Sequence, residues 1–408
     1  MSRNAKVHEW ENNVDIQIFR EYLRIPSVHP DIDYDGCVEF LLRQASILEL
    51  PCEVIEVDPG KPVVLMTWNG THPEEGSILL NSHMDVVPVY AAKWSYPPFS
   101  AHMTDDGKIY GRGSQDMKCV GIQFLAVIRA LKREGVRLRR TVHVTFVPDE
   151  EIGGTLGMKE FVKTDRFKQL NVGFAIDEGC ASENEVFYLF YAERVLRRVN
   201  FYISGTPGHG SLLLKNTAGE KARLLIDRMM DFRKHEETRL ANNSKLFIGD
   251  VTTVNLTMMS GGVQSNVVPP ELMLCFDIRV SLDPGATAME EKIEQWCQEA
   301  GGGIRIEYGE KDPELQPTKL DKSNPFWVAF KRSINAMELE IQPQVLPGAT
   351  DIRFLREQGI PALGFSPMNN TPILLHAHDE YLGADVFLKG IEIYKNIIVS
   401  VANVKSES

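Results

Sequence analysis

A regular alternation of apolar strand segments with an amphipathic helical segment constrains the fold of this chain more than any other feature. Strands are predicted at residues 77–82, 141–147 and 172–176, and a helix at residues 116–134 separates the first two. Asp116 is a suitable N-cap for that helix. Because strands that alternate with helices are typical of βαβ units, the pattern predicts an α/β fold with a mixed sheet and helices on both of its faces.

The middle of the chain follows a different order. The predicted elements there are strand, helix, strand, strand, helix and strand, at residues 198–204, 217–234, 253–260, 272–280, 286–299 and 303–308. This β-α-β-β-α-β order is the split-βαβ pattern of ferredoxin-like α+β domains. We therefore expect residues 196–312 to form an inserted domain between two parts of the larger α/β domain, residues 1–195 and 313–408.

Length, charge and cysteine usage narrow the class of protein. A chain of 408 residues is long for one core, and its net charge of −12 disfavours nucleic acid and anionic membranes as partners. The most apolar segment, residues 120–131, is too short to span a bilayer. The first eleven residues lack the apolar segment of a secretory signal, and the six cysteines are scattered, so we expect a cytoplasmic protein with reduced thiols.

One predicted strand is followed by a pair of potential metal ligands. His83 and Asp85 are two residues apart, so in an extended strand their side chains point to the same side. An imidazole and a carboxylate suit a divalent metal ion, with the carboxylate orienting the histidine ligand from behind. A His-x-Asp pair also occurs on ordinary surfaces, so this motif does not decide the question by itself.

Further acidic and imidazole side chains come directly after short apolar segments. These residues are Asp116, Glu150, Glu151, Glu178, His376 and His378. In open α/β sheets, active sites form at such strand ends. Each residue also has a structural reading, as a solvated carboxylate, a helix cap or a core histidine, but the recurrence of the pattern favours a metal centre.

The motifs as a set carry a family resemblance from about residue 10 to about residue 400. They are Ser82-His-Met-Asp-Val-Val-Pro88, Arg112-Gly-Ser-Gln-Asp-Met-Lys118, Pro148-Asp-Glu-Glu151, Gly205-Thr-Pro-Gly-His209 and Gly364-Phe-Ser-Pro-Met-Asn369. In these motifs the chain resembles the zinc-dependent aminoacylase and carboxypeptidase–desuccinylase family of metallohydrolases. The resemblance implies a two-domain enzyme with two zinc ions per chain, in which the inserted domain forms a homodimer contact.

The resemblance also implies which residues bind the ions. His83 and Glu178 would bind one zinc, Glu151 and His376 the second, and Asp116 would bridge the two. Five protein ligands for two ions leave an open position for water, as hydrolysis requires. In the same family the bond after the bridging aspartate is cis, so we expect a cis peptide between Asp116 and Met117. His378 competes with His376 as the ligand, although the family motif favours His376.

Two carboxylates are expected to assist the reaction. Glu150 is the expected general base, which takes a proton from the attacking water and delivers it to the leaving amine. Adjacent residues of an extended segment point apart, so Glu150 and Glu151 can divide these tasks. Asp85 would orient His83 and raise its basicity.

The inserted domain is expected to contribute His209 and Asn266. His209 ends a strand in a Gly/Pro turn, and Asn266 lies in a second turn. The family uses such a histidine and asparagine to stabilise the oxyanion in the active site of the partner subunit. For Asn266, a plain turn residue is the alternative.

Two further residues are candidates for the substrate carboxylate. Arg279 is an isolated cation on an apolar strand, where a buried guanidinium needs an anion, and a salt bridge to Asp277 is judged less favourable. Thr350 precedes a predicted helix, so its hydroxyl either binds the carboxylate or caps the helix. Arg353 is a weaker candidate.

The predicted activity is hydrolysis of N-acyl-L-amino acids to a carboxylate and a free amino acid. A metallo-dipeptidase or carboxypeptidase on the same scaffold is the alternative, because a peptide substrate needs a polar partner for its free amine where an N-acyl chain needs an apolar slot. A non-catalytic binding module is less favoured, since no ligand position and no general base is missing.

Overall fold

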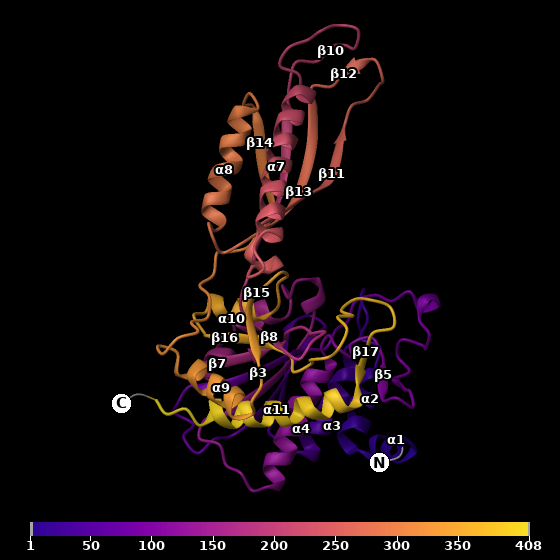
Figure 1. Ribbon diagram of the computed structural model, residues 1–408, viewed down its shortest axis with the longest axis vertical. Helices are drawn as coiled ribbons and strands as arrows, with labels where there is room; N and C mark the ends of the chain where they lie inside the picture. The colour runs from indigo at the N-terminus through magenta and orange to yellow at the C-terminus, as the bar shows by residue number, and fades with distance from the viewer. Residues whose placement is uncertain (1–2, 407–408) are drawn as a thin grey trace. The chain divides into compact units, whose positions relative to one another are not determined.

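The computed structural model describes residues 3–406, which form two compact units (Figure 1). Among the described residues, the larger unit contains residues 3–191, 317–343 and 350–406. The smaller unit contains residues 192–316 and 344–349. Among the helices of residues 3–406, none is both long and apolar enough to cross a membrane.

An eight-stranded mixed sheet forms the centre of the larger unit. Its strands, in spatial order, are β1 (Cys52–Asp58), β2 (Lys61–Trp68), β6 (Val142–Val147), β3 (Ser77–His83), β7 (Val172–Asp177), β16 (Ala362–Phe365), β8 (Phe187–Glu193) and β15 (Ile341–Leu346). The neighbours among β6, β3, β7 and β16 are parallel, whereas β1–β2, β2–β6 and β16–β8 are antiparallel. A small second sheet consists of β17 (Tyr381–Gly383), β5 (Lys108–Tyr110) and β4 (His102–Met103).

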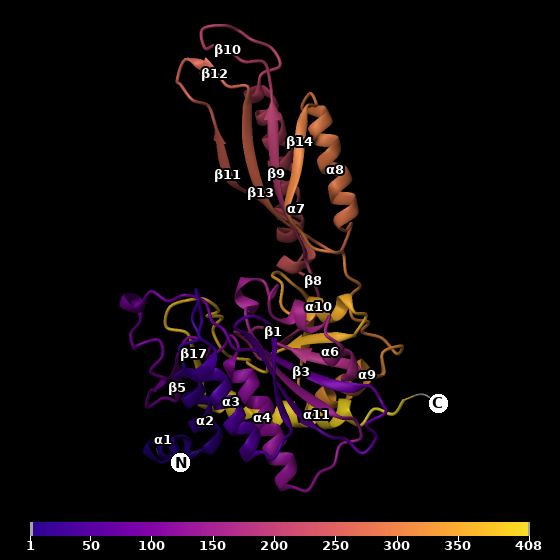
Figure 2. The same ribbon diagram turned by 180° about the vertical axis from the view of Figure 1, so that it is seen from behind.

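Helices cover both faces of this sheet, as predicted. Successive residues of β2 enter different cores, because the side chains of a strand alternate between its two faces. Val64 and Met66 join the larger core, and Val63 and Leu65 join the smaller one. The larger core is closed by α2 (Val14–Leu23), α3 (Asp35–Ile47), α4 (Lys118–Arg133), α9 (Pro325–Ala336) and α11 (Ala384–Ala402), and the smaller by α5 (Met158–Phe161), α6 (Asp165–Gln169) and α10 (Ile352–Glu357). Helix α1 (Arg3–Asn12) precedes α2, and Figure 2 shows the unit from behind.

Helix α4 begins beside the predicted ligands. Of the two predictions made for its start, one is confirmed and the other is wrong. The peptide bond between Asp116 and Met117 is cis, as predicted. Asp116 is not the N-cap, however, because the helix begins two residues later and Met117 occupies that position without a side-chain hydrogen bond. The carboxylate of Asp116 is hydrogen-bonded to two histidines instead.

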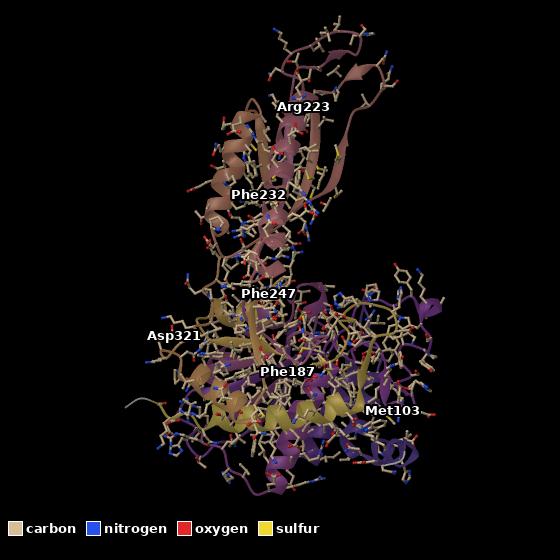
Figure 3. The ribbon with its side chains drawn as sticks, in the orientation of Figure 1. Met103, Phe187, Arg223, Phe232, Phe247 and Asp321 are labelled. Atoms are coloured by element: carbon tan, nitrogen blue, oxygen red, sulfur yellow. The ribbon has the colours of Figure 1, made fainter. Side chains whose placement is uncertain are left out.

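The smaller unit has the predicted β-α-β-β-α-β order. Its elements are β9 (Val195–Ser204), α7 (Ala218–Ala241), β11 (Thr253–Gly261), β13 (Glu271–Val280), α8 (Ala286–Glu299) and β14 (Ile304–Lys311). The sheet order is β11-β13-β9-β14, with antiparallel neighbours. Phe232 of α7, labelled in Figure 3, packs against Trp296 of α8 with ring centroids 5.7 Å apart. Two short strands, β10 (Gly208–His209) and β12 (Val267–Val268), pair separately.

Candidate metal centre

Parallel pairing of three strands brings the predicted ligands together. Strand β3 ends at His83, and its parallel neighbours β6 and β7 end just before the Glu150–Glu151 pair and Glu178. The carboxyl ends of parallel strands meet at one edge of a sheet. Two more residues join them from outside the sheet, Asp116 from the start of α4 and His376 from the loop before β17.

These residues form two clusters that share one carboxylate. In the first cluster, His83 Nε2 lies 3.0 Å from Asp116 Oδ1 and 3.7 Å from Glu178 Oε1. In the second cluster, His376 Nε2 lies 3.0 Å from Asp116 Oδ2 and 3.0 Å from Glu151 Oε2. Within each cluster the ligand atoms lie within 4.8 Å of one another. Asp116 therefore offers one oxygen to each cluster, which is the arrangement that a bridging ligand has.

The electrostatics of the first cluster favour a bound cation. Burial raises the pKa of Glu178 well above its usual range, and the nearby charge of Asp116 adds to this effect. Burial alone would also raise the pKa of Asp116, but hydrogen bonds with His376 and His83 hold it well below its usual range. Buried carboxylates are costly unless positive charge compensates them. Here a metal ion can supply that charge.

His376, rather than His378, belongs to the second cluster. Hydrogen bonds with Asp116 and Glu151 raise the pKa of His376 to about 10. Its side chain is 54% exposed, so this part of the centre is open to solvent. His378 instead meets the ring of Tyr90 edge-on, with centroids 6.0 Å apart.

The turn that carries Glu150 and Glu151 is not the extended segment that we expected. Residues Glu150–Ile152 form one turn of 3₁₀ helix, so the two side chains diverge by helical rotation and not by strand alternation. Glu151 faces His376, while Glu150 Oε2 lies 4.0 Å from His83 Nε2. Burial and the neighbouring Glu178 raise the pKa of Glu150 well above its usual value.

Asp85 holds the His83 ring through its backbone oxygen and not through its carboxylate. The Nδ1 atom of His83 is 2.8 Å from the backbone carbonyl oxygen of Asp85, whereas the carboxylate is 3.6 Å away. The carboxylate accepts hydrogen bonds from the backbone N–H groups of Glu150 and Glu151, at 3.2 and 3.0 Å, and lies 2.8 Å from His29 Nε2. Asp85 thus supports the turn of Glu150 through its carboxylate and the histidine through its backbone.

A buried group next to this turn was missed by the sequence analysis. Asp149 is 1% exposed and has a left-handed backbone with φ of 64°. Its carboxylate accepts a hydrogen bond of 2.7 Å from the hydroxyl of Tyr34 and lies 2.7 Å from Lys61 Nζ. His29, Tyr34 and Lys61 are distant in sequence from this turn, and no local pattern marks them.

The two predicted residues of the smaller unit lie close to each other. His209 pairs with Val267 across the β10–β12 ladder, and the N–H of Gly210 donates to the carbonyl oxygen of Asn266 at 2.8 Å. The His209 ring lies 2.7 Å from the hydroxyl of Ser211. Both predicted side chains are exposed.

The expectation for Arg279 was wrong in one respect. Its guanidinium donates two hydrogen bonds to the carboxylate of Asp277, at 2.8 and 3.2 Å. Residues two apart on a strand face the same side, so this pair is favoured by strand geometry.

Thr350 is buried and lies one residue before Asp351, the N-cap of α10, so it does not cap that helix. Arg353 donates to the carbonyl oxygen of Gly153 at 2.7 Å, which places it behind the Glu151 turn.

Comparison with known proteins places the chain in a family. The model of peptidase family M20/M25/M40 matches residues 79–400, and the chain belongs to this family of amide-hydrolysing enzymes. Among its relatives, aminoacylase-1 of Sus scrofa is 49% identical over 389 residues, or 95% of each chain. Aminoacylase-1 of Homo sapiens is 47% identical over 394 residues, or 97% of each chain. The resemblance inferred from the motifs is confirmed.

A solved structure supports the fold. A dinuclear metal-binding peptidase of the M20 family from Bacillus subtilis superimposes with a TM-score of 0.68 at 16% sequence identity. The match covers 96% of this chain and 98% of the other.

Proposed function

We propose that this protein is a di-zinc aminoacylase that hydrolyses N-acyl-L-amino acids to a carboxylate and a free L-amino acid. The metal centre is proposed mainly because the two carboxylate oxygens of Asp116 face His83 and His376, at 3.0 Å each. The near full-length identity of 47–49% to aminoacylase-1 supports the substrate class.

The donor atoms fit zinc. Imidazole nitrogen and carboxylate oxygen are its usual ligands besides thiolate, and the five residues offer both kinds to each position. When bound, two zinc ions supply the positive charge that polarises the amide carbonyl and acidifies the attacking water. Asp116→Ala is expected to weaken both metal positions together. Loss of only one ion in calorimetry would contradict the bridging assignment.

Glu150 is the proposed general base. It lies beside the metal ligands without belonging to either three-residue cluster, so its carboxylate is placed to accept a proton from the attacking water and return it to the leaving amine. Glu150→Gln should lower kcat by about 10²–10⁴-fold with metal content unchanged. Glu160→Gln, at a carboxylate whose side chain is 37% exposed and which belongs to neither cluster, is the matched control and should behave as wild type. A Glu150 variant without metal would show that Glu150 is a ligand.

A substrate panel tests the proposed activity. Metal-loaded protein is assayed with N-acetyl-L-amino acids and with dipeptides of the same residues. We expect higher kcat/KM for the N-acetyl compounds, and a preference for dipeptides would overturn the proposal.

In the bound substrate, Thr350 and Arg279 are the proposed contacts of the α-carboxylate. Arg279 would then share its guanidinium between the substrate and Asp277, so Arg279→Ala should raise KM more than it lowers kcat.

We also propose a homodimer in which His209 and Asn266 serve the active site of the partner subunit. Their exposure on neighbouring turns, and the exposed Met258 and Met259 on the edge strand β11, support a protein contact here. His209→Ala and Glu150→Ala should each be nearly inactive. Each mixed heterodimer has one intact site, so it should have up to about half of the activity of a wild-type dimer. Heterodimers without activity would show that His209 acts within its own chain or is only structural.

The protein is further proposed to be cytoplasmic. The six cysteines are all free thiols in the structure, which agrees with a reducing compartment. Fluorescence microscopy of the tagged protein tests this proposal.

A further inference from the structure

A buried glutamine next to the bridging ligand is tied to the loop of the other histidine. Gln115 is 1% exposed. Its Nε2 donates hydrogen bonds to the carbonyl oxygens of Pro372 and Tyr381, at 3.0 and 2.9 Å, and its Oε1 accepts one from the N–H of Leu374 at 3.0 Å. Every one of these partners is a backbone group of residues 372–381, the segment that contains His376.

A buried glutamate of the His376 loop binds in turn to the segment that contains Gln115. Glu380 comes from the histidine loop and is 0% exposed. Its carboxylate accepts hydrogen bonds from the backbone N–H of Gln115 at 2.7 Å and from the guanidinium of Arg112 at 2.5 Å. The side chain of each segment therefore holds the backbone of the other. We call these two residues, Gln115 and Glu380, the clamp.

The two histidines of the centre depend on the clamp to different degrees. His83 lies at the end of a central strand, is 1% exposed and is held by the carbonyl oxygen of Asp85. His376 lies in a loop, has a left-handed backbone with φ of 61°, and has a side chain that is 54% exposed. Its side chain contacts Asp116 and Glu151, which are proposed ligands themselves, so the position of its loop depends on contacts that neighbouring residues make.

We propose that Gln115 and Glu380 are positioning residues that place His376 against Asp116 and so set the affinity of the second metal position. Without the clamp, the loop keeps the hydrogen bonds from Ser95 to Asp379 but loses those on either side of His376, so the donor set of Asp116, Glu151 and His376 loses its geometry. The first position has no donor from this loop and should keep its affinity. This inference rests on the proposed two-metal centre.

The experiment is a zinc titration of the metal-free protein by calorimetry. Gln115→Met keeps the shape of the side chain and removes its hydrogen bonds, and we expect one site to weaken about 10–100-fold, the usual effect of losing a partner that orients a ligand. The other site should change less than threefold. Excess zinc should restore most of the activity.

Gln123→Met is the matched control. Gln123 is also a fully buried glutamine, on α4, and its Nε2 donates to the carbonyl oxygen of Phe387 at 3.0 Å, but it holds no residue of the histidine loop. The control should lose a similar amount of thermal stability and keep both sites. If Gln115→Met does not fold, Gln115→Asn, which is too short to reach all three backbone groups, is measured in the same way.

The outcomes separate the clamp from the metal proposal. If the wild type binds two ions and the sites of Gln115→Met are unchanged or equally weakened, the positioning role of the clamp is refuted and the two-metal centre is not. A wild-type protein that binds one ion would refute the two-metal centre and this inference with it.

Discussion

The buried ion pair behind the Glu150 turn gives a prediction with a calculable size. Asp149 is 1% exposed, and the side chain of Lys61 is 20% exposed. Lys61→Met removes the ammonium group and leaves a buried carboxylate with the hydroxyl of Tyr34 as its main partner. Removing one member of a buried pair costs about 3–5 kcal/mol. Because water still reaches Lys61, we expect the lower end, about 3 kcal/mol of unfolding free energy.

A double variant isolates the charge effect. Asp149→Asn keeps an oxygen for the hydrogen bond of Tyr34 and removes the charge that Lys61 balances. Lys61→Met combined with Asp149→Asn should therefore be more stable than Lys61→Met alone by about 2 kcal/mol, because no uncompensated charge remains. Urea unfolding followed by circular dichroism measures all three variants under the same metal loading.

An exposed ion pair provides the control for this series. Lys163 and Glu160 are 2.5 Å apart, with side chains 54% and 37% exposed. Lys163→Met should cost less than about 0.5 kcal/mol, as is usual for surface pairs. If Lys61→Met costs no more than this control, or if the two changes at Lys61 and Asp149 are additive, the buried pair does not stabilise the turn. A lower kcat with little change in KM for Lys61→Met would show that the turn also positions Glu150.

Two further predictions concern stability elsewhere. Burial lowers the pKa of His143 to about 4 from 6.5, so the unfolded chain binds more protons between these pH values and stability falls as the pH drops through them. The stability advantage of wild type over His143→Gln should thus shrink by about 3 kcal/mol from pH 7 to pH 4, and a constant difference would contradict this. A Cβ on Gly157 would lie 1.9 Å from the carbonyl oxygen of Pro148, so Gly157→Ala should lower the melting temperature markedly. Gly219, the second residue of α7, has open space around it, so Gly219→Ala should stabilise the protein by about 0.4–1 kcal/mol, and equal effects of the two alanines on unfolding would refute the packing argument.

The sequence was sufficient for the order of the elements and for selecting candidate ligands that lie together in the structure. Strand and helix periods are local, so the order of the inserted β-α-β-β-α-β unit was predicted, with element ends close to those observed except at α7, which continues to Ala241 where the prediction ended at residue 234. The ligand candidates were found because each follows a short apolar segment. His83 and Asp116 lie together in the structure because parallel strands and the start of α4 meet at one edge.

The contacts that support the ligands were not predictable in the same way. Gln115 and Glu380 are 265 residues apart, and Lys61 and Asp149 are 88 apart, so no period or spacing in the sequence relates them. The pair of Arg279 and Asp277 is the exception, because two-residue spacing on a strand places both side chains on one face. For Asp85, the spacing correctly placed the residue near His83 but did not reveal that the carboxylate serves the Glu150 turn.

The candidate ligands lie far apart in the sequence, so the two clusters that share Asp116 become complete at different times during synthesis of the chain. Chain growth on the ribosome is sequential, and His83, Asp116 and Glu178 have all been synthesised when less than half of the chain is complete. The second cluster needs His376, which is translated only after the whole inserted unit. A nascent chain therefore carries every donor of the first cluster long before the second cluster can exist. In the proposed two-metal centre, the first ion has an opportunity to load during translation, whereas the second cluster can be filled only on a nearly finished protein.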